Sequence, residues 1–171
     1  MLQNSSSISE MDMEKIAAIV NHVYRETEKA LWKPGAARTN VKEIKQIADN
    51  GELAVARLND EIVGCVRIQR LDERTGEFGM LAVDEHYQGN GIGRALIRFA
   101  EEKCKSENLQ NMQLELLVPN EGSHPFKARL EKWYTRIGYV PVHTEAVDAL
   151  FPELAPMLAI PCKFIIFQKE L

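Results

Sequence analysis

The residues whose types and spacing most directly suggest chemistry are Gln88–Arg94, which read QGNGIGR. They follow a stretch of strand-like alternation over Glu77–Val83 and precede a stretch in which apolar residues recur at helical spacing from Ile92. A strand that leads through glycines into a helix can hold phosphate, because the first turn of the helix has unpaired N–H groups and the positive end of the helix dipole. Glycines also lack the Cβ atoms that would keep an anion away from these amides.

The spacing of the glycines narrows the kind of phosphate site. A mononucleotide P-loop ends in Gly-Lys-Ser/Thr, whereas here Gly93 is followed by Arg94 and Ala95. A dinucleotide fingerprint reads G-x-G-x-x-G near the start of a βαβ unit, with an acidic residue about 20 positions later. This loop instead reads G-x-G-x-G in the middle of the chain. Taken alone, the motif is also compatible with a glycine-rich turn that binds no ligand.

Two motifs resemble the GNAT superfamily of N-acetyltransferases. Gln88, Gly91 and Gly93 fill the pattern Q/R-x-x-G-x-G/A of the acyl-CoA pyrophosphate loop. Downstream, Tyr134-x-x-x-Gly138-Tyr139 is similar to the end of the fourth helix in these enzymes. The resemblance covers roughly Ile8 to Val140 and implies an acetyl-CoA-dependent N-acetyltransferase that needs no metal.

The resemblance also implies where acetyl-CoA binds and how it reacts. An acceptor amine would attack the thioester directly in a ternary complex, without an acyl-enzyme, and a backbone amide near Leu81 would hold the oxyanion. The end of the predicted strand would pair with pantetheine, and the loop would bind the pyrophosphate. The CoA-binding residues implied are Leu81, Ala82, Val83, Gln88, Gly89, Asn90, Gly91, Ile92, Gly93, Arg94 and Asn120.

Two side chains would then carry proton transfer. Tyr134 matches the family's general acid, and a phenol with an ordinary pKa of about 10 can protonate a thiolate whose conjugate acid has a pKa of about 8.5. Glu77 matches the carboxylate that takes the amine proton, and Glu115 on the following strand is its competitor. The alternatives without a catalytic role are that Tyr134 is a core aromatic residue and that the two glutamates are exposed strand residues.

The chain departs from the family pattern in one place. Lys127 stands seven residues before Tyr134, where asparagine is usual, and Asn120 lies earlier, before an apparent insertion over residues 120–127. The role of this insertion is open, and His124 in it is interpreted as a surface histidine rather than a base. In the family, the first helix-loop-helix forms one wall of the acceptor site, which makes Trp32, Lys33 and Arg38 candidate substrate contacts.

The periodicity and turn signals predict a single α/β domain over residues 1–171. The resemblance implies that it has the GNAT-type fold: a central mixed, mostly antiparallel sheet with one splayed parallel pair, flanked by helices. Predicted strands cover Leu2–Ile8, Leu53–Leu58, Ile62–Ile68, Glu77–Val83, Met112–Val118, Cys162–Gln168 and a segment from Tyr139. The first predicted helix has a capped start at Ser9–Asp12 and runs to about Leu31, and further helices cover Val41–Ala48, Ile92–Cys104 and Phe126–Ile137. The turn signal Asn59-Asp60-Glu61 predicts a β-hairpin between Leu53–Leu58 and Ile62–Ile68. The proline-punctuated tail over residues 146–161 is expected to form a short helix or loop.

Composition excludes several classes of function. With 45% hydrophobic residues, 27% charged residues and a net charge of −4, the 171-residue chain has no basic run for nucleic acid or an anionic membrane. It has no apolar run long enough to span a membrane and no apolar signal-peptide region, so we expect a cytoplasmic protein. Cys65, Cys104 and Cys162 are predicted to be reduced core thiols.

Several points stay open at this level. The acceptor can be a small amine or a peptide, and a homodimer is compatible with the sequence. A non-catalytic acyl-CoA sensor or interaction module would keep the glycine loop without needing Glu77 or Tyr134. A nucleotide-binding domain could use the same loop.

Overall fold

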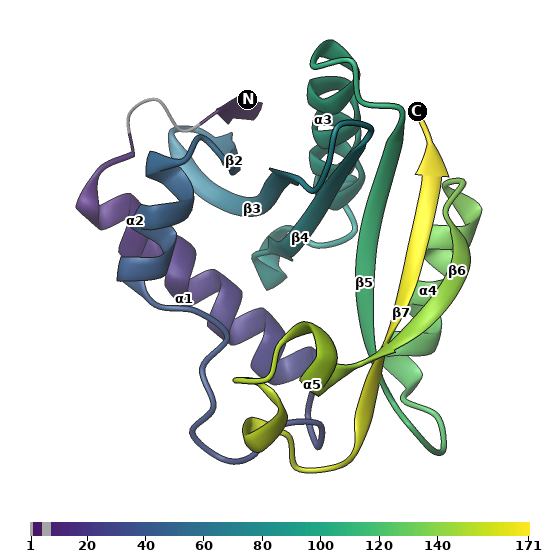
Figure 1. Ribbon diagram of the computed structural model, residues 1–171. Helices are drawn as coiled ribbons and strands as arrows, with labels where there is room; N and C mark the ends of the chain where they lie inside the picture. The colour runs from purple at the N-terminus through teal and green to yellow at the C-terminus, as the bar shows by residue number, and fades with distance from the viewer. Residues whose placement is uncertain (1, 5–7) are drawn as a thin grey trace. The chain divides into compact units, whose positions relative to one another are not determined.

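The computed structural model describes residues 2–4 and 8–171, which form two compact units. The first unit contains the chain up to Glu26, residues 37–112 and Leu171, and the second contains residues 27–36 and 113–170. Both units combine strands with helices (Figure 1). The mixed α/β class predicted from the sequence is therefore confirmed.

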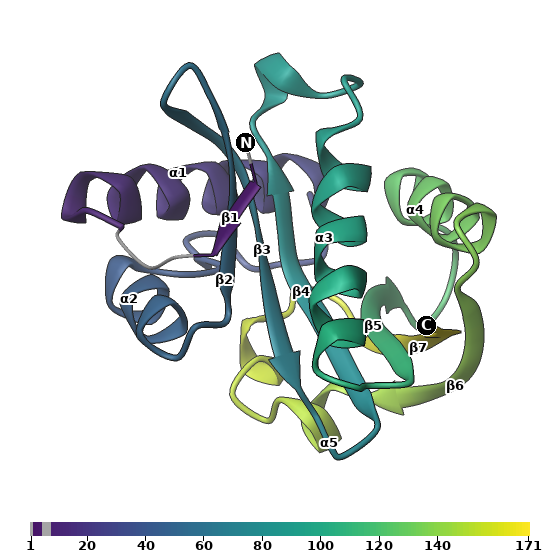
Figure 2. The same cartoon turned by 90° about the horizontal axis from the view of Figure 1, so that it is seen from above.

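The first unit is a sheet between two layers of helices. Its strands have the order β1-β2-β3-β4, and all neighbours are antiparallel. α1 and α2 lie on one face of this sheet and α3 lies on the other (Figure 2). In chain order the elements are β1 (Leu2–Asn4), α1 (Glu10–Thr27), α2 (Val41–Asp49), β2 (Leu53–Leu58), β3 (Glu61–Arg70), β4 (Thr75–Val83), the 3-10 helix η1 (Glu85–Tyr87) and α3 (Ile92–Ser106).

Local signals in the sequence explain how these elements begin and turn. The Ser9 hydroxyl accepts a hydrogen bond from the Asp12 amide at 3.1 Å, and Asp12 accepts one from the Ser9 amide, so α1 starts at a capping box. Asn40 caps α2 through the Glu43 amide at 3.0 Å. Asn59 and Asp60 have φ values of 49° and 66°, which two-residue hairpin turns require. The predicted capped helix and hairpin are confirmed.

β4 contains one residue more than β3 opposite it. The pairs Cys65↔Ala82 and Arg67↔Gly79 show that the extra residue falls between Gly79 and Ala82. Met80, in this interval, has the left-handed φ value of 50°. Such a β-bulge changes the direction of the side chains that follow it. Met80 consequently packs with the core that α1 and α2 form on the sheet.

The second unit is a sheet whose middle strand β7 is covered on both faces, whereas its edge strand β6 is mostly exposed. Its strands have the order β5-β7-β6, with β6 antiparallel to β7. On one face of β7, Phe164 and Ile166 pack with Leu31, and on the other Phe167 meets the ring of Tyr134 from α4. The elements are β5 (Asn111–Pro119, whose first two residues belong to the first unit), α4 (Pro125–Arg136), β6 (Val140–Ala146), α5 (Val147–Leu150), the 3-10 helix η2 (Ala155–Met157) and β7 (Cys162–Glu170).

Several predicted boundaries need correction. α1 ends at Thr27 rather than near Leu31, because Ala30 has the left-handed φ value of 72° and Leu31 belongs to the core of the second unit. The loop after β5 is shorter than the predicted 120–127, since Pro125 already begins α4. Of the predicted N-terminal strand, residues 2–4 form β1, while residues 5–7 lie outside the described part of the chain. The splayed parallel pair stays a prediction.

Gly76 in β4 is a steric constraint on the packing of α3. A Cβ atom at this position would collide with Cys104 Sγ and lie 3.2 Å from Leu109 Cδ1. Gly79, on the same strand, has no atom within 4 Å of such a Cβ. The two glycines therefore form a matched pair for mutation.

We expect Gly76→Ala to lower the free energy of unfolding by about 1–3 kcal/mol through overpacking. Gly79→Ala should be neutral or add up to about 1 kcal/mol, because alanine restricts the unfolded chain more than glycine does. Urea unfolding followed by circular dichroism measures both. Adding Cys104→Ala to Gly76→Ala should recover part of the loss, and equal stability of the two glycine variants would refute the packing argument.

Candidate functional site

The side chains between β4 and α3 hold the backbone of the glycine loop. Asp84 Oδ1 accepts a hydrogen bond from the His86 amide at 3.0 Å and lies 2.9 Å from Nδ1 of the His86 ring. The contact between the carboxylate and the ring raises the pKa of His86. Gln88 Nε2 donates to the carbonyl of Val83 at 3.2 Å, and Asn90 Nδ2 donates to that of Tyr87 at 3.3 Å. The two amide side chains of the motif thus shape the loop from within.

The glycines leave the start of α3 open. Gly89 and Gly91 have φ values of 81° and 78°, and an added Cβ at either would meet nothing within 4 Å. Gly91 is the N-cap of α3 and supplies no side-chain hydrogen bond, and the first turn of α3 contains no acidic residue. The first amides of α3 and the dipole are therefore available to an anion.

The predicted CoA-binding residues of the first unit follow one another along the chain from the bulge into α3. Ala82 is buried, Leu81 and Val83 are half-buried, and the loop from Gln88 to Gly91 is exposed. Within α3, Ile92 and Gly93 are half-buried and Arg94 is exposed. The contacts of these residues with pantetheine and pyrophosphate remain predictions.

Glu77 is buried, so the alternative interpretation of this residue as an exposed strand glutamate is wrong. Its exposed fraction is 7%, and Gln69 Nε2 donates a hydrogen bond to Glu77 Oε1 at 2.7 Å. Since Gly76 faces α3, the alternation of β4 places Glu77 on the opposite face of the sheet. A buried carboxylate on this face can accept a proton if a substrate amine reaches it.

Tyr134, Glu115 and Asn120 belong to the second unit. Tyr134 is 7% exposed, and its ring centroid lies 5.2 Å from that of Trp133 and 6.3 Å from those of Tyr139 and Phe167. Its phenol is therefore held by an aromatic cluster. Glu115 is half-buried on β5, and Asn120 is exposed just after that strand. Glu77 and the glycine loop therefore belong to the first unit, and Tyr134, Glu115 and Asn120 belong to the second.

A buried ion pair in the second unit was missed by the sequence analysis. The Lys127 ammonium bonds to one carboxylate oxygen of Glu28, and the Trp32 indole N–H bonds to the other. The side chains of Lys127 and Glu28 are only 6% and 4% exposed. The position where the family usually has asparagine therefore anchors residues 27–36 to α4, which also accounts for Trp32 as a packing residue.

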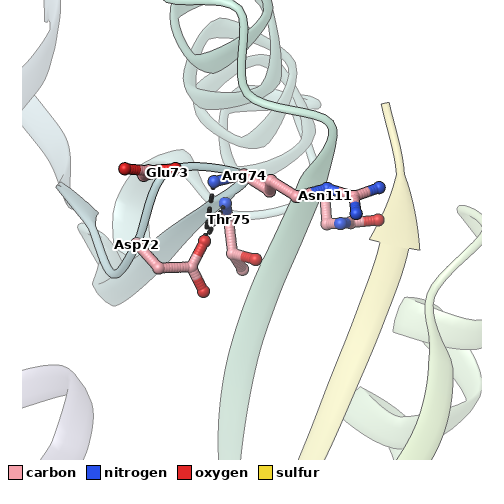
Figure 3. A pocket seen from close by; sticks show the side chains of 5 residues that line it. All are labelled: Asp72, Glu73, Arg74, Thr75 and Asn111. Carbon is pink, nitrogen blue, oxygen red and sulfur yellow. Dashed lines mark hydrogen bonds between the residues drawn. The ribbon is translucent and has the colours of Figure 1, made fainter.

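The turn between β3 and β4 lines a separate hollow of about 500 Å³ (Figure 3). Asp72 Oδ1 accepts hydrogen bonds from the amides of Arg74 and Thr75 at 2.7 and 2.8 Å, and the Asn111 amide donates to the Arg74 carbonyl at 3.0 Å. These polar groups close the turn. The hollow lies at the start of β4, whereas the glycine loop follows the end of that strand, so it is not part of the candidate site.

Other features of the described residues bear on the class of protein. The three cysteines are free and buried, as predicted. Among residues 2–4 and 8–171, no cluster of His, Cys, Asp and Glu has the size needed to hold a metal ion. No helix in the described chain combines the length and apolar character needed to cross a membrane.

The chain belongs to the acetyltransferase (GNAT) family, whose model matches residues 17–139, well over half of the sequence. Family membership supports acetyl transfer as the general class of reaction. A search of curated proteins found no match.

Solved structures share the fold at low sequence identity. A ribosomal-protein-alanine N-acetyltransferase from Brucella melitensis is 16% identical with a TM-score of 0.72, covering 100% of this chain and 99% of that one. An acetyltransferase from Streptococcus agalactiae 2603 is 17% identical with a TM-score of 0.73, covering 100% and 98%. A GNAT acetyltransferase from Elizabethkingia anophelis with acetyl-CoA bound is 18% identical with a TM-score of 0.60, covering 100% and 97%.

Gly91 provides a test of the loop. Gly91→Ala places a Cβ on a left-handed residue, which costs roughly 1 kcal/mol of stability and brings a methyl group to the start of α3. Acetyl-CoA and CoA at about 100 times their Kd should stabilise the wild-type protein by about 2.7 kcal/mol, a rise of several degrees in Tm. ATP and NAD should not, and Gly91→Ala should lose most of the rise.

The control is Gly51→Ala, because Gly51 after α2 also has a left-handed φ, of 71°, and open surroundings. It should show the same intrinsic loss of Tm and keep the full response to CoA. A Gly91→Ala protein that responds to CoA like the control would remove the loop from the binding site.

The Glu28–Lys127 pair generates a stability prediction. Lys127→Met leaves a buried, uncompensated carboxylate and should cost about 3–5 kcal/mol. Adding Glu28→Gln removes the second charge while keeping an acceptor for Trp32, so the double variant should be more stable than Lys127→Met alone. Denaturant unfolding measures the cycle.

The matched control is Lys45→Met in the exposed Lys45–Asp49 pair, whose side chains are both 61% exposed and whose atoms lie 2.8 Å apart. Loss of this surface pair should change stability by only about 0.5 kcal/mol. Equal effects of Lys45→Met and Lys127→Met would contradict a structural role for the buried pair.

Proposed function

We propose that the protein is an N-acetyltransferase that transfers the acetyl group of acetyl-CoA to a primary amine by direct attack in a ternary complex. The observation that carries this proposal is the open glycine loop between β4 and α3, in a chain that belongs to the GNAT family. The acceptor would be a small amine or a peptide, and the reaction would take place in the cytoplasm.

The residues of the first unit fit acetyl-CoA as a co-substrate. The amides from Gln88 to Arg94 would bind the pyrophosphate, because no side chain caps α3 and both left-handed glycines are open. The end of β4, Leu81 to Val83, would bind pantetheine as an added strand, and a backbone amide near Leu81 would hold the oxyanion. Asn120 would be a further contact from the second unit.

The proposed reaction balances protons between two side chains. The amine nitrogen forms a bond to the thioester carbonyl carbon, and Glu77 takes the proton that the nitrogen loses. The carbon–sulfur bond then breaks, and the phenol of Tyr134 donates a proton to the departing thiolate. The burial of both side chains supports these roles, because bulk water has little access to them and cannot readily replace either one in the proton transfers.

The cysteines support direct attack over an acyl-enzyme. Burial raises the pKa of Cys65 to about 12 and that of Cys104 to about 11, and it also raises the pKa of Cys162. These thiols stay protonated at neutral pH, while the thiolate is the nucleophilic form. None is therefore suited to accept the acetyl group.

We predict that Tyr134→Phe lowers kcat by roughly 10²-fold and leaves KM for acetyl-CoA nearly unchanged, because only proton donation in the transition state is lost. Release of the CoA thiol, measured over an amine panel and a range of pH, provides the rates. Thr135→Val on α4, which likewise removes only a hydroxyl group and loses its exposed bond to the Glu131 carbonyl, serves as the control and should retain the wild-type kcat.

Two outcomes would revise the proposal. An unchanged kcat in Tyr134→Phe would remove the acid role of this residue. Absence of transfer by the wild-type protein across a broad amine and peptide panel, together with intact CoA binding, would favour a non-catalytic acyl-CoA sensor.

A further inference from the structure

A depression of about 440 Å³ lies at one end of the strands of the second unit, where β5 and β6 end and β7 begins. Seven of its ten lining residues are apolar by type, including Val147 of α5 and Leu158 and Ile160 of the segment before β7, and polar and apolar atoms contribute about equally to its surface. Asn120, Asp148 and Cys162 supply its polar side chains. The proposed acetyl-transfer reaction assigns no role to Asp148.

The polar groups of the depression favour a cation over an anion. The backbone N–H of Asn120 donates to the Pro161 carbonyl at 2.9 Å, and that of Ala159 donates to the Leu31 carbonyl at 2.8 Å, so these two backbone donors are already used. The Asn120 side chain is neutral and offers both a donor and an acceptor. Cys162 remains a neutral thiol, because burial raises its pKa. No Lys, Arg or His is among the lining residues. Asp148 is the charged group that remains.

Asp148 is free to bind a ligand. It is exposed in the first turn of α5 and forms no ion pair or side-chain hydrogen bond within the part of the chain that the structure describes. A carboxylate beside apolar walls matches an ammonium group carried on a hydrocarbon body: the charge binds Asp148 and the body covers Leu158 and Ile160.

The depression is fixed before any ligand binds. The Lys33 amide donates to the Met157 carbonyl at 2.9 Å, and the Lys33 ammonium donates to that of Pro156 at 2.6 Å. Trp32 forms a β-bridge with Leu158. The buried Glu28–Lys127 pair anchors residues 27–36, which in turn hold residues 156–158. The depression therefore requires little reorganisation when a ligand binds.

The depression is remote from the proposed general acid. Cys162 lines the depression, whereas the ring of Tyr134 packs on Phe167, five residues further along β7. At about 3.3 Å per residue, the two positions on the strand are roughly 17 Å apart. The depression therefore suits a part of the ligand that is distant from the reacting atoms.

We propose that this depression binds the ammonium group and hydrocarbon body of an aliphatic amine, with Asp148 as the specificity-determining residue. It would hold the non-reacting end of the acceptor, which makes aliphatic diamines the favoured class of substrate; this last step rests on the proposed function. Asp148 contacts only the distant ammonium group and takes no part in proton transfer.

Binding is tested on the full chain without acetyl-CoA, by following backbone amide chemical shifts by NMR during titration with hexamethylenediamine. The amides around Val147 and Ile160 should shift, hexylamine should give the same pattern, and hexanol and hexanoate should bind more weakly. Asp148→Asn should raise the Kd of hexamethylenediamine by about two- to fivefold, as expected for loss of an exposed ion pair. Glu153→Gln, an exposed carboxylate between α5 and η2 that does not line the depression, is the control and should leave Kd unchanged.

Turnover supplies the second readout. With hexamethylenediamine as acceptor, Asp148→Asn should raise KM by the same factor as Kd and leave kcat unchanged, since the lost contact is equal in ground and transition states. Hexanol binding as tightly as hexylamine, or equal Kd values for Asp148→Asn and wild type, would overturn the proposal.

The two proposals fail in different ways. If acetyl-CoA does not bind but the diamine titration depends on Asp148, the N-acetyltransferase function falls and the amine site stands. If acetyl transfer proceeds normally and Asp148→Asn changes neither Kd nor KM, the amine site falls and the function stands.

Discussion

The extra residue in β4 is the constraint on which the candidate site of the first unit depends. Without it, strict alternation would send Met80 to the α3 face, as it does Gly76; with it, Met80 packs in the core under α1 and α2, where it is 3% exposed. The left-handed backbone at Met80 costs roughly 1–2 kcal/mol, and burial of its side chain contributes a comparable 1.5–3 kcal/mol or so, which offsets the strain. The bulge also separates the ladder that carries Glu77 from the strand end that leads into the glycine loop.

The elements that the sequence predicted correctly are those that local patterns determine. The Ser9–Asp12 capping box, the Asn59–Asp60 turn and the glycines before α3 are each decided by neighbouring residues. The end of α1 could not be predicted in this way. Leu31 continues the apolar spacing of the helix, but it is buried in the core of the second unit, and only tertiary packing reveals which core receives an apolar residue.

The candidate site divides along the same line. The loop could be recognised because Gln88, Gly91 and Gly93 are adjacent and their conformation is local. The Glu28–Lys127 pair joins residues 99 positions apart, so no spacing rule could find it, although the unusual lysine was visible as a departure from the family pattern. The burial of the pair explains why lysine stands where the family usually has asparagine. The Lys127 ammonium compensates the charge of the buried Glu28 carboxylate.

The glycine loop and the depression favour ligands of opposite charge. The exposed glycines and uncapped amides of the first unit attract an anion, whereas the depression of the second unit has a free carboxylate and no lining base. A CoA pyrophosphate and an ammonium-bearing acceptor would each be repelled from the other's position. Two co-substrates whose charged groups bind at different residues can occupy one protein together, and direct attack in a ternary complex requires such simultaneous binding. The raised thiol pKa values of Cys65 and Cys104 agree with the proposed direct attack, because a protonated thiol is a poor nucleophile.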